Sequence, residues 1–147
     1  MLATAGTYIL LLESDREMTI EIGKLGIFVF LPGCYAYVGS AFGPGGLKSR
    51  VGRHLKKTKN NRWHIDYLRT HSKPYEVWYS HHQKKQECIC LWQLYAMNGS
   101  DCPCKGFGSS DYAYPSHLVY FKHKPSFIMF KKQTNLSMQK LALQLLN

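Results

Sequence analysis

Five side chains of this sequence are of types that could bind and cleave a phosphodiester, and they occur in four short groups along the chain. Tyrosines stand in Gly6-Thr7-Tyr8 and in Tyr37-Val38-Gly39. Arg50 and His54 are four residues apart, a spacing that places both side chains on one face of a helix. Glu87 follows at the start of a later helical pattern. A guanidinium can contact a phosphate through two parallel hydrogen bonds, a carboxylate can anchor a hard cation, and phenol and imidazole groups can position or transfer protons.

Short apolar runs bounded by turn residues predict the strands that would carry the two tyrosines. Thr7 to Leu12 reads as a buried strand that opens directly after Gly6. Cys34 to Ser40 alternates as a strand does, with Tyr35 and Tyr37 on one face. Further strands are predicted at Thr19 to Ile22, Ile27 to Phe30, Tyr75 to Ser80, His117 to Phe121 and Phe127 to Phe130.

Helical spacing of apolar residues predicts the elements that would present the remaining groups. Leu47, Val51 and Leu55 follow the glycine-rich turn at residues 43–46, and the helix they define carries Arg50 and His54 on its polar side. Further helices are expected to start at Trp63 to Leu68 and to span Lys84 to Ala96 and Leu136 to Leu146, with a loop at Asn98 to Ser110. We therefore predict an α/β fold of the α+β type, with a small central antiparallel sheet flanked by helices. Because no internal repeat or long linker is visible, residues 1–147 are expected to form a single domain.

The charge of the chain favours a polyanionic partner. Lysine and arginine number 19 against nine acids, giving a net charge of +10, and nucleic-acid backbones are the commonest polyanions that a small basic protein meets. A solubility device or a ribosome-associated surface would give the same excess. The apolar runs are too short to span a bilayer and no signal peptide is recognisable, so a cytoplasmic location is expected. The candidate contacts to a nucleic-acid backbone are Lys48, Arg53, Lys56, Lys57, Lys59 and Arg62.

The order of the four groups resembles that of the GIY-YIG nuclease superfamily over about residues 6–96. The runs at residues 33–68 and 106–121 look like the small stand-alone Uri-type branch of that superfamily. The resemblance implies a GIY-YIG-like nuclease domain with a motif core at about 6–96 and a family-specific extension at 97–147. It also implies a metal-dependent endonuclease that hydrolyses DNA with one Mg²⁺ or Mn²⁺ ion.

The resemblance assigns a role to each of the five side chains. Glu87 would be the metal ligand, and Arg50 would clamp the phosphate and stabilise the transition state. Tyr8 would be the general base, with its pKa lowered by Arg50 and the cation, while Tyr37 would position the reacting groups. His54 would be an auxiliary group near the attacking water or the phosphate.

Each of these side chains also has a plainer interpretation. Glu87 could stabilise the N-terminus of its helix, Arg50 could be a solvated residue of an amphipathic helix, and His54 could be an ordinary surface histidine. The two tyrosines could be core residues. A non-catalytic, basic nucleic-acid-binding module on the same scaffold is therefore the alternative function, and the sequence does not separate DNA from RNA or define the oligomeric state.

Two cysteine pairs raise the question of zinc. Cys88 and Cys90, like Cys102 and Cys104, have one residue between them, whereas zinc sites usually have two to four. We therefore do not expect a structural zinc site, although a zinc-dependent protein remains a third alternative. His64 and Asp66 are expected to cap a helix rather than to bind metal.

Overall fold

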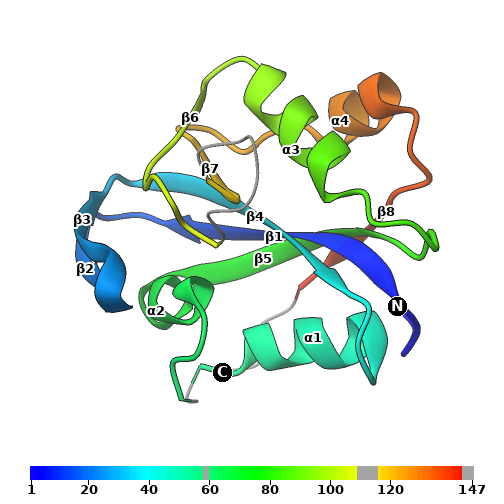
Figure 1. Ribbon diagram of the computed structural model, residues 1–147. Helices are drawn as coiled ribbons and strands as arrows, with labels where there is room; N and C mark the ends of the chain where they lie inside the picture. The colour runs from blue at the N-terminus through cyan, green and yellow to red at the C-terminus, as the bar shows by residue number, and fades with distance from the viewer. Residues whose placement is uncertain (58–59, 109–115, 144–147) are drawn as a thin grey trace.

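The described residues of this protein, 1–57, 60–108 and 116–143 of a computed structural model, form one antiparallel sheet with helices on both faces (Figure 1). Within these residues, no helix is long and apolar enough to cross a bilayer. The predicted fold class is confirmed. The sheet has the order β6-β7-β4-β1-β5-β8 and consists of β1 (Gly6–Ser14), β4 (Gly33–Ala41), β5 (Lys73–Ser80), β6 (Ser100–Asp101), β7 (Leu118–Phe121) and β8 (Gln139–Ala142). The helices are α1 (Gly46–Leu55), α2 (His64–His71), α3 (Glu87–Ala96) and α4 (Phe127–Thr134). The two strands predicted between β1 and β4 are present as β2 (Met18–Ile22) and β3 (Gly26–Phe30), which pair with each other in a separate two-stranded sheet.

The central strand β1 divides the core into two layers. Tyr8, Leu10 and Leu12 pack on the α1 and α2 side, whereas Ile9 and Leu11 pack on the α3 and α4 side. This alternation follows from the period of two along a strand. Because both faces of β1 are covered, its sequence is an almost uninterrupted apolar run rather than an alternating one, as expected of a fully buried strand.

A buried ion pair ties α1 to α2. The Arg53 guanidinium donates two hydrogen bonds to the Asp66 carboxylate, at 2.7 and 2.9 Å, and the Asp66 side chain is fully buried. Asp66 also accepts hydrogen bonds from the backbone N–H groups of Arg62 and Trp63, at 2.8 and 2.9 Å. The predicted capping role of Asp66 is therefore confirmed, and the same carboxylate holds the helix that carries Arg50.

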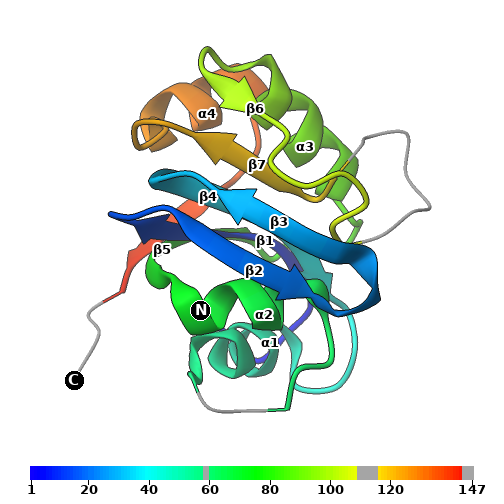
Figure 2. The ribbon, with the colours of Figure 1, turned by 90° about the vertical axis from the view of Figure 1, so that its left-hand side faces the viewer.

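Strand β4 is paired with β7 along only part of its length. Strand β7 pairs with β4 only from Cys34 to Tyr37, and β6 continues the sheet beyond β7 (Figure 2). Beyond Tyr37, no strand in the described parts of the chain pairs with β4 on that side. Val38 is instead joined to His117, whose carbonyl oxygen accepts a hydrogen bond from the Val38 N–H at 3.0 Å. The last residues of β4 therefore present a strand edge to a space between the two helical layers.

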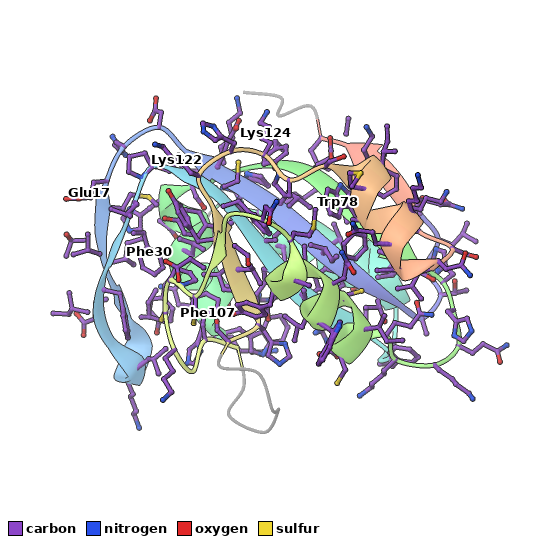
Figure 3. All side chains as sticks on the ribbon, turned by 90° about the horizontal axis from the view of Figure 1, so that it is seen from above. Glu17, Phe30, Trp78, Phe107, Lys122 and Lys124 are labelled. Atoms are coloured by element: carbon purple, nitrogen blue, oxygen red, sulfur yellow. The ribbon has the colours of Figure 1, made fainter. Side chains whose placement is uncertain are left out.

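The segment from Phe127 to Phe130 forms helix α4, so its prediction as a strand was wrong. Ser126 caps the helix, because its hydroxyl accepts a hydrogen bond from the Met129 N–H at 3.2 Å. Phe127 and Phe130 are one helical turn apart, and both rings lie 5.2 Å from the Trp78 ring (Figure 3 labels Trp78 beside α4). An apolar run of four residues fits either structure, and here the cap and Trp78 select the helix.

The C-terminal segment was predicted as a helix from Leu136 to Leu146, and this prediction was also wrong in the part that the structure describes. Gln139–Ala142 instead forms β8, which pairs antiparallel with β5. The Tyr79 hydroxyl donates to Gln139 Oε1 at 2.8 Å, and Met138 is buried under the sheet. This pairing provides hydrogen-bond partners for the backbone groups along the outer edge of β5. The spacing of apolar residues in the C-terminal segment does not reveal that this edge of β5 needs a partner. The short strand β6 likewise lies in a segment predicted to be a loop.

Asp66→Asn is expected to lower the free energy of unfolding by about 3 kcal/mol, because it leaves the Arg53 guanidinium without its ionic partner. Burial opposes ionisation of Asp66, but the hydrogen bonds from Arg53, Trp63 and Arg62 outweigh it and lower the pKa of this carboxyl group. A group with a lowered folded-state pKa stabilises the protein above its unfolded-state pKa, near 4, and loses that contribution as the pH falls further.

Urea unfolding of the wild type and of Asp66→Asn at several pH values measures this effect. The difference between the two proteins should be constant near neutral pH and should shrink below about pH 4. Glu21→Gln, at an exposed position of β2, is the control and should cost little at either pH. A wild-type advantage that stays the same in acid would contradict the assignment.

Candidate active site

A cleft of 320 Å³ lies where the edge of β4 is left open. Tyr8 of β1, Tyr37 of β4, Arg50 of α1 and Glu87 of α3 all line it. Four of the five side chains singled out from the sequence therefore converge on one space, although they come from four elements on both faces of the sheet. Among the other lining residues are Ser40, Arg62, Trp63, His64 and His117.

Two glycines of the motifs allow this convergence. A side chain at Gly39 would place its Cβ 2.5 Å from the Tyr8 hydroxyl, so only glycine lets the phenol lie against β4. A Cβ at Gly6 would lie 2.4 Å from Leu47 and from the Ser80 carbonyl oxygen, so this glycine allows α1 to pack close to β1. Each glycine serves close packing at the cleft.

His54 lies beneath the cleft rather than in its lining. Its Nε2 atom is 2.6 Å from the Tyr8 hydroxyl, and the side chain is 1% exposed. The Tyr8 ring is 5.4 Å and the Tyr37 ring 5.9 Å from the imidazole. The interpretation of His54 as a surface histidine was therefore wrong. His54 is not among the residues that line the cleft, and its hydrogen bond to the Tyr8 hydroxyl connects it to one that is.

Burial keeps both phenols in the protonated state. It raises the pKa of Tyr8 well above the ordinary value, and Tyr37 adds to the effect while Arg50 opposes it. Burial, followed by the charge of Glu87, likewise raises the pKa of Tyr37. The expected lowering of the Tyr8 pKa by Arg50 is present, but burial outweighs it. Each tyrosine can therefore donate a hydrogen bond at neutral pH.

The two arginines of α1 have different surroundings. The Arg50 guanidinium lies 4.6 Å from the centre of the Trp63 ring and donates a hydrogen bond to the Ser40 carbonyl oxygen at 3.3 Å. Arg53 lies 4.2 Å from the same ring, but it forms the ion pair with Asp66. Both guanidinium groups therefore lie close to the same aromatic ring. Arg50 faces the cleft, whereas the charge of Arg53 is largely neutralised.

Glu87 is the first residue of α3, and its helix is fixed to β1 just beside the cleft. The Thr7 hydroxyl accepts a hydrogen bond from the Gln86 N–H at 3.0 Å, immediately before Glu87. Glu87 is 8% exposed. Its Oε1 atom accepts a hydrogen bond from the Ser40 hydroxyl, and its Oε2 atom is 3.6 Å from Nδ1 of His117.

Ser40 and His117 were not recognised as site residues from the sequence. Ser40 directly follows the Tyr37-Val38-Gly39 motif, and this adjacency was its one available signal. His117 lies 30 residues beyond Glu87 and had been assigned only as the start of a strand. It reaches the cleft because its backbone N–H donates to the Phe107 carbonyl at 2.8 Å, which fixes the segment that precedes β7.

A basic groove of 630 Å³ adjoins the cleft along the outer side of α1. Lys48, Lys56 and Arg62 line it together with Arg53, and Arg62 also lines the cleft. Of the proposed backbone-binding residues, Lys57 instead lines a separate groove. Lys59 is outside the described residues.

The cleft fits a single hard cation. Glu87 is the one carboxylate among its described lining residues, and Mg²⁺ is commonly held by one or two carboxylates, its remaining ligands being waters and substrate phosphate. Across the described chain, no cluster of three or more His, Cys, Asp or Glu residues could enclose a metal ion. Cys88 is exposed and Cys90 buried, as expected for residues that point to different sides of a helix.

Residues 7–140 of the chain match a family model that is described as a domain of unknown function, DUF123. No curated protein and no solved structure matches the chain. The matched region extends from β1 to the beginning of β8 and includes every residue of the cleft named above. Because the match covers most of the 147 residues, the chain belongs to the DUF123 family.

Proposed function

We propose that this protein is a metal-dependent endonuclease of the GIY-YIG type that hydrolyses phosphodiester bonds in DNA. The observation that supports this most directly is the meeting of Tyr8, Tyr37, Arg50 and Glu87 around one cleft. These are the residues to which the resemblance to Uri-type nucleases assigns catalytic roles. They come together from distant parts of the chain, which core packing of separate tyrosines would not require.

Arg50 binds the scissile phosphate. Its guanidinium lines the cleft and is held from behind by the Trp63 ring and the Ser40 carbonyl. A fixed guanidinium can form two parallel hydrogen bonds to phosphate oxygens and can offset the negative charge that accumulates in the transition state. Because Trp63 and Ser40 orient this side chain before substrate binds, little reorganisation is needed during the reaction.

Glu87 holds the divalent cation, Mg²⁺ or Mn²⁺. When bound, the cation neutralises charge on the phosphoryl oxygens and the leaving oxygen. The carboxylate accepts a hydrogen bond from Ser40 and lies beside His117, and it is the one carboxylate among the described residues that line the cleft. A cleft with one carboxylate repels a phosphate backbone less than a cluster of acids would.

Tyr8 and His54 move the proton. Because Tyr8 is protonated at rest, it can accept a proton from the attacking water only if it gives up its own. His54 Nε2, 2.6 Å from the hydroxyl, is placed to take that proton. As the water oxygen bonds to phosphorus, the bond from phosphorus to the leaving sugar oxygen breaks, and the leaving oxygen takes a proton from solvent. The proton of the attacking water passes to the Tyr8 oxygen, and the phenol proton passes to His54 Nε2. Tyr37 positions the phosphate or the water.

The basic groove supplies the binding surface for the substrate backbone. It meets the cleft at Arg62, so a strand whose phosphate lies at Arg50 can continue past Lys48 and Lys56. Contacts of this kind do not depend on base sequence and weaken with salt. The groove would equally serve a binding module without catalytic activity, and the experiments below separate the two functions.

Glu87→Ala is expected to abolish cleavage by the protein, with a loss of at least about 100-fold, because the cation loses its ligand. Cleavage is measured with Mg²⁺ or Mn²⁺ on single-stranded, duplex, flapped and branched substrates, and binding is measured in parallel. Binding should persist in the variant, and Glu21→Gln should cleave like the wild type. Equal activity of wild type and Glu87→Ala would reject the metal assignment. Absence of cleavage by both, with binding retained, would favour the non-catalytic module.

Tyr8→Phe is expected to lower kcat by about 10²- to 10⁴-fold, the usual contribution of general acid–base catalysis. KM and substrate binding should change little, because the phenylalanine ring preserves the packing against β4. Tyr67→Phe, at a partly exposed tyrosine of α2, is the matched control. A Tyr8→Phe protein with wild-type kcat would show that the water is activated without the Tyr8–His54 pair.

Replacing both Lys48 and Lys56 by alanine should weaken DNA binding and flatten its salt dependence. Each lost phosphate contact removes about 0.9 from the slope of log K against log salt for duplex DNA, so the double variant should lose about 2. Lys131→Ala with Lys132→Ala, on α4 across the sheet, is the control and should keep the wild-type slope. An unchanged slope in the groove variant would place the backbone-binding surface elsewhere.

A further inference from the structure

Ser40 and His117 contact the two oxygens of the same carboxylate from different parts of the chain. Ser40 is on β4, and its hydroxyl donates to Oε1 of Glu87. His117 immediately precedes β7, and its Nδ1 atom lies 3.6 Å from Oε2. His117 is joined to β4 by the hydrogen bond from the Val38 N–H to its carbonyl oxygen, and Ser40 follows Val38 by two residues on the same strand. They therefore form a bracket around Glu87, built on the free edge of the sheet.

The surroundings of His117 determine which of its nitrogens carries a proton. Nδ1 lies 3.1 Å from the Val38 carbonyl oxygen as well as 3.6 Å from the Glu87 carboxylate. A carbonyl oxygen can only accept a hydrogen bond, and an ionised carboxylate is also only an acceptor. Nδ1 must therefore carry the hydrogen that it directs toward them. The Nδ1–H group donates to the Val38 carbonyl oxygen, and its nitrogen lies 3.6 Å from Glu87 Oε2, an electrostatic contact that is longer than a hydrogen bond.

The backbone around His117 keeps this donor in place. Its N–H donates to the Phe107 carbonyl at 2.8 Å, and its carbonyl accepts from the Val38 N–H at 3.0 Å. Gly108 packs directly on the side chain, since a Cβ there would lie 2.7 Å from Cβ of His117. The side chain is 4% exposed. A histidine held this firmly can restrict the rotation of the carboxylate beside it.

We propose that Ser40 and His117 are positioning residues that hold the Glu87 carboxylate ready for a divalent cation. This inference rests on the proposed function, because it assumes that Glu87 is the metal ligand. A free glutamate side chain loses rotational entropy when it binds, and a side chain fixed beforehand does not. Donors around a ligating carboxylate also orient its remaining lone pairs, and removal of such partners typically weakens metal binding 10- to 100-fold.

Mn²⁺ binding to the purified full chain tests the inference without relying on cleavage. The free Mn²⁺ signal in electron paramagnetic resonance gives the dissociation constant for wild type, Ser40→Ala and His117→Ala. Each variant is expected to bind Mn²⁺ about 10-fold more weakly or worse. Ser40→Thr keeps the hydroxyl and His117→Asn keeps an N–H donor near the Nδ1 position, so both should recover much of the affinity. Ser137→Ala and His123→Asn, at exposed positions, are the matched controls.

Glu87→Ala separates failure of this inference from failure of the proposed function. If wild type and Glu87→Ala bind Mn²⁺ equally, Glu87 is not the ligand and the proposed cation site is wrong. If Glu87→Ala loses Mn²⁺ while Ser40→Ala and His117→Ala bind like wild type, the cation site stands and the bracket is rejected. Loss of affinity that Ser40→Thr and His117→Asn do not restore would also reject the bracket, since it would indicate general damage to the fold.

Nitrogen-15 NMR of the His117 ring in the wild type tests the bracket even if a variant fails to fold. In its neutral form the ring should carry its hydrogen on Nδ1. A neutral ring with its hydrogen on Nε2 would overturn the proposal, because Nδ1 could then neither donate to Val38 nor direct a hydrogen toward Glu87.

Discussion

The early end of the β4–β7 ladder is the constraint on which the rest of the site depends. Pairing stops at Tyr37, and within the described chain no strand covers the remainder of β4 on that side. If β4 were paired along its whole length, the sheet would separate Tyr8, Tyr37 and Arg50 on the α1 face from Glu87 on the α3 face. Because β4 is left open, Arg50 and Glu87, which belong to helices on opposite faces, line one cleft. The geometry of the site is thus a property of the sheet edge rather than of any one helix.

Around this edge, residues that do not themselves line the cleft support the elements and side chains that do. His54 supports Tyr8 from below, Asp66 holds the helix that carries Arg50, and Thr7 fixes the start of α3. Burial makes these contacts effective, since hydrogen bonds and charges are stronger where water is excluded. It also keeps the phenols protonated, so Tyr8 needs the His54 imidazole as an acceptor to serve as a base. His54, which does not line the cleft, therefore links the protonated resting state of Tyr8 to its proposed role as a base.

Sequence patterns predicted the elements of the motif core because those elements are locally determined. The apolar run of β1 can be recognised within a single segment of the chain, and so can the helical spacing of Leu47, Val51 and Leu55. The C-terminal errors arose where a neighbour decides the structure. Trp78 and a serine cap make α4 a helix, and the open edge of β5 makes the following segment a strand. His117 was missed for the same reason, since only the fold brings it beside a residue so distant in the chain. The catalytic roles of the site residues stay predictions.

The strands that flank β4, β1 and β5 come from residues beyond the motif core at about residues 6–96. β7 covers one side of β4, and β8 covers the outer side of β5. A fragment ending near residue 96 would retain Tyr8, Tyr37, Arg50 and Glu87 yet expose the backbone of two long apolar strands. Such strands pair readily with other chains, so the fragment would be prone to aggregation and strand exchange. A fragment that folds well therefore needs more of the chain than the four residues that converge on the cleft, and protein engineering on this scaffold has to keep the C-terminal third.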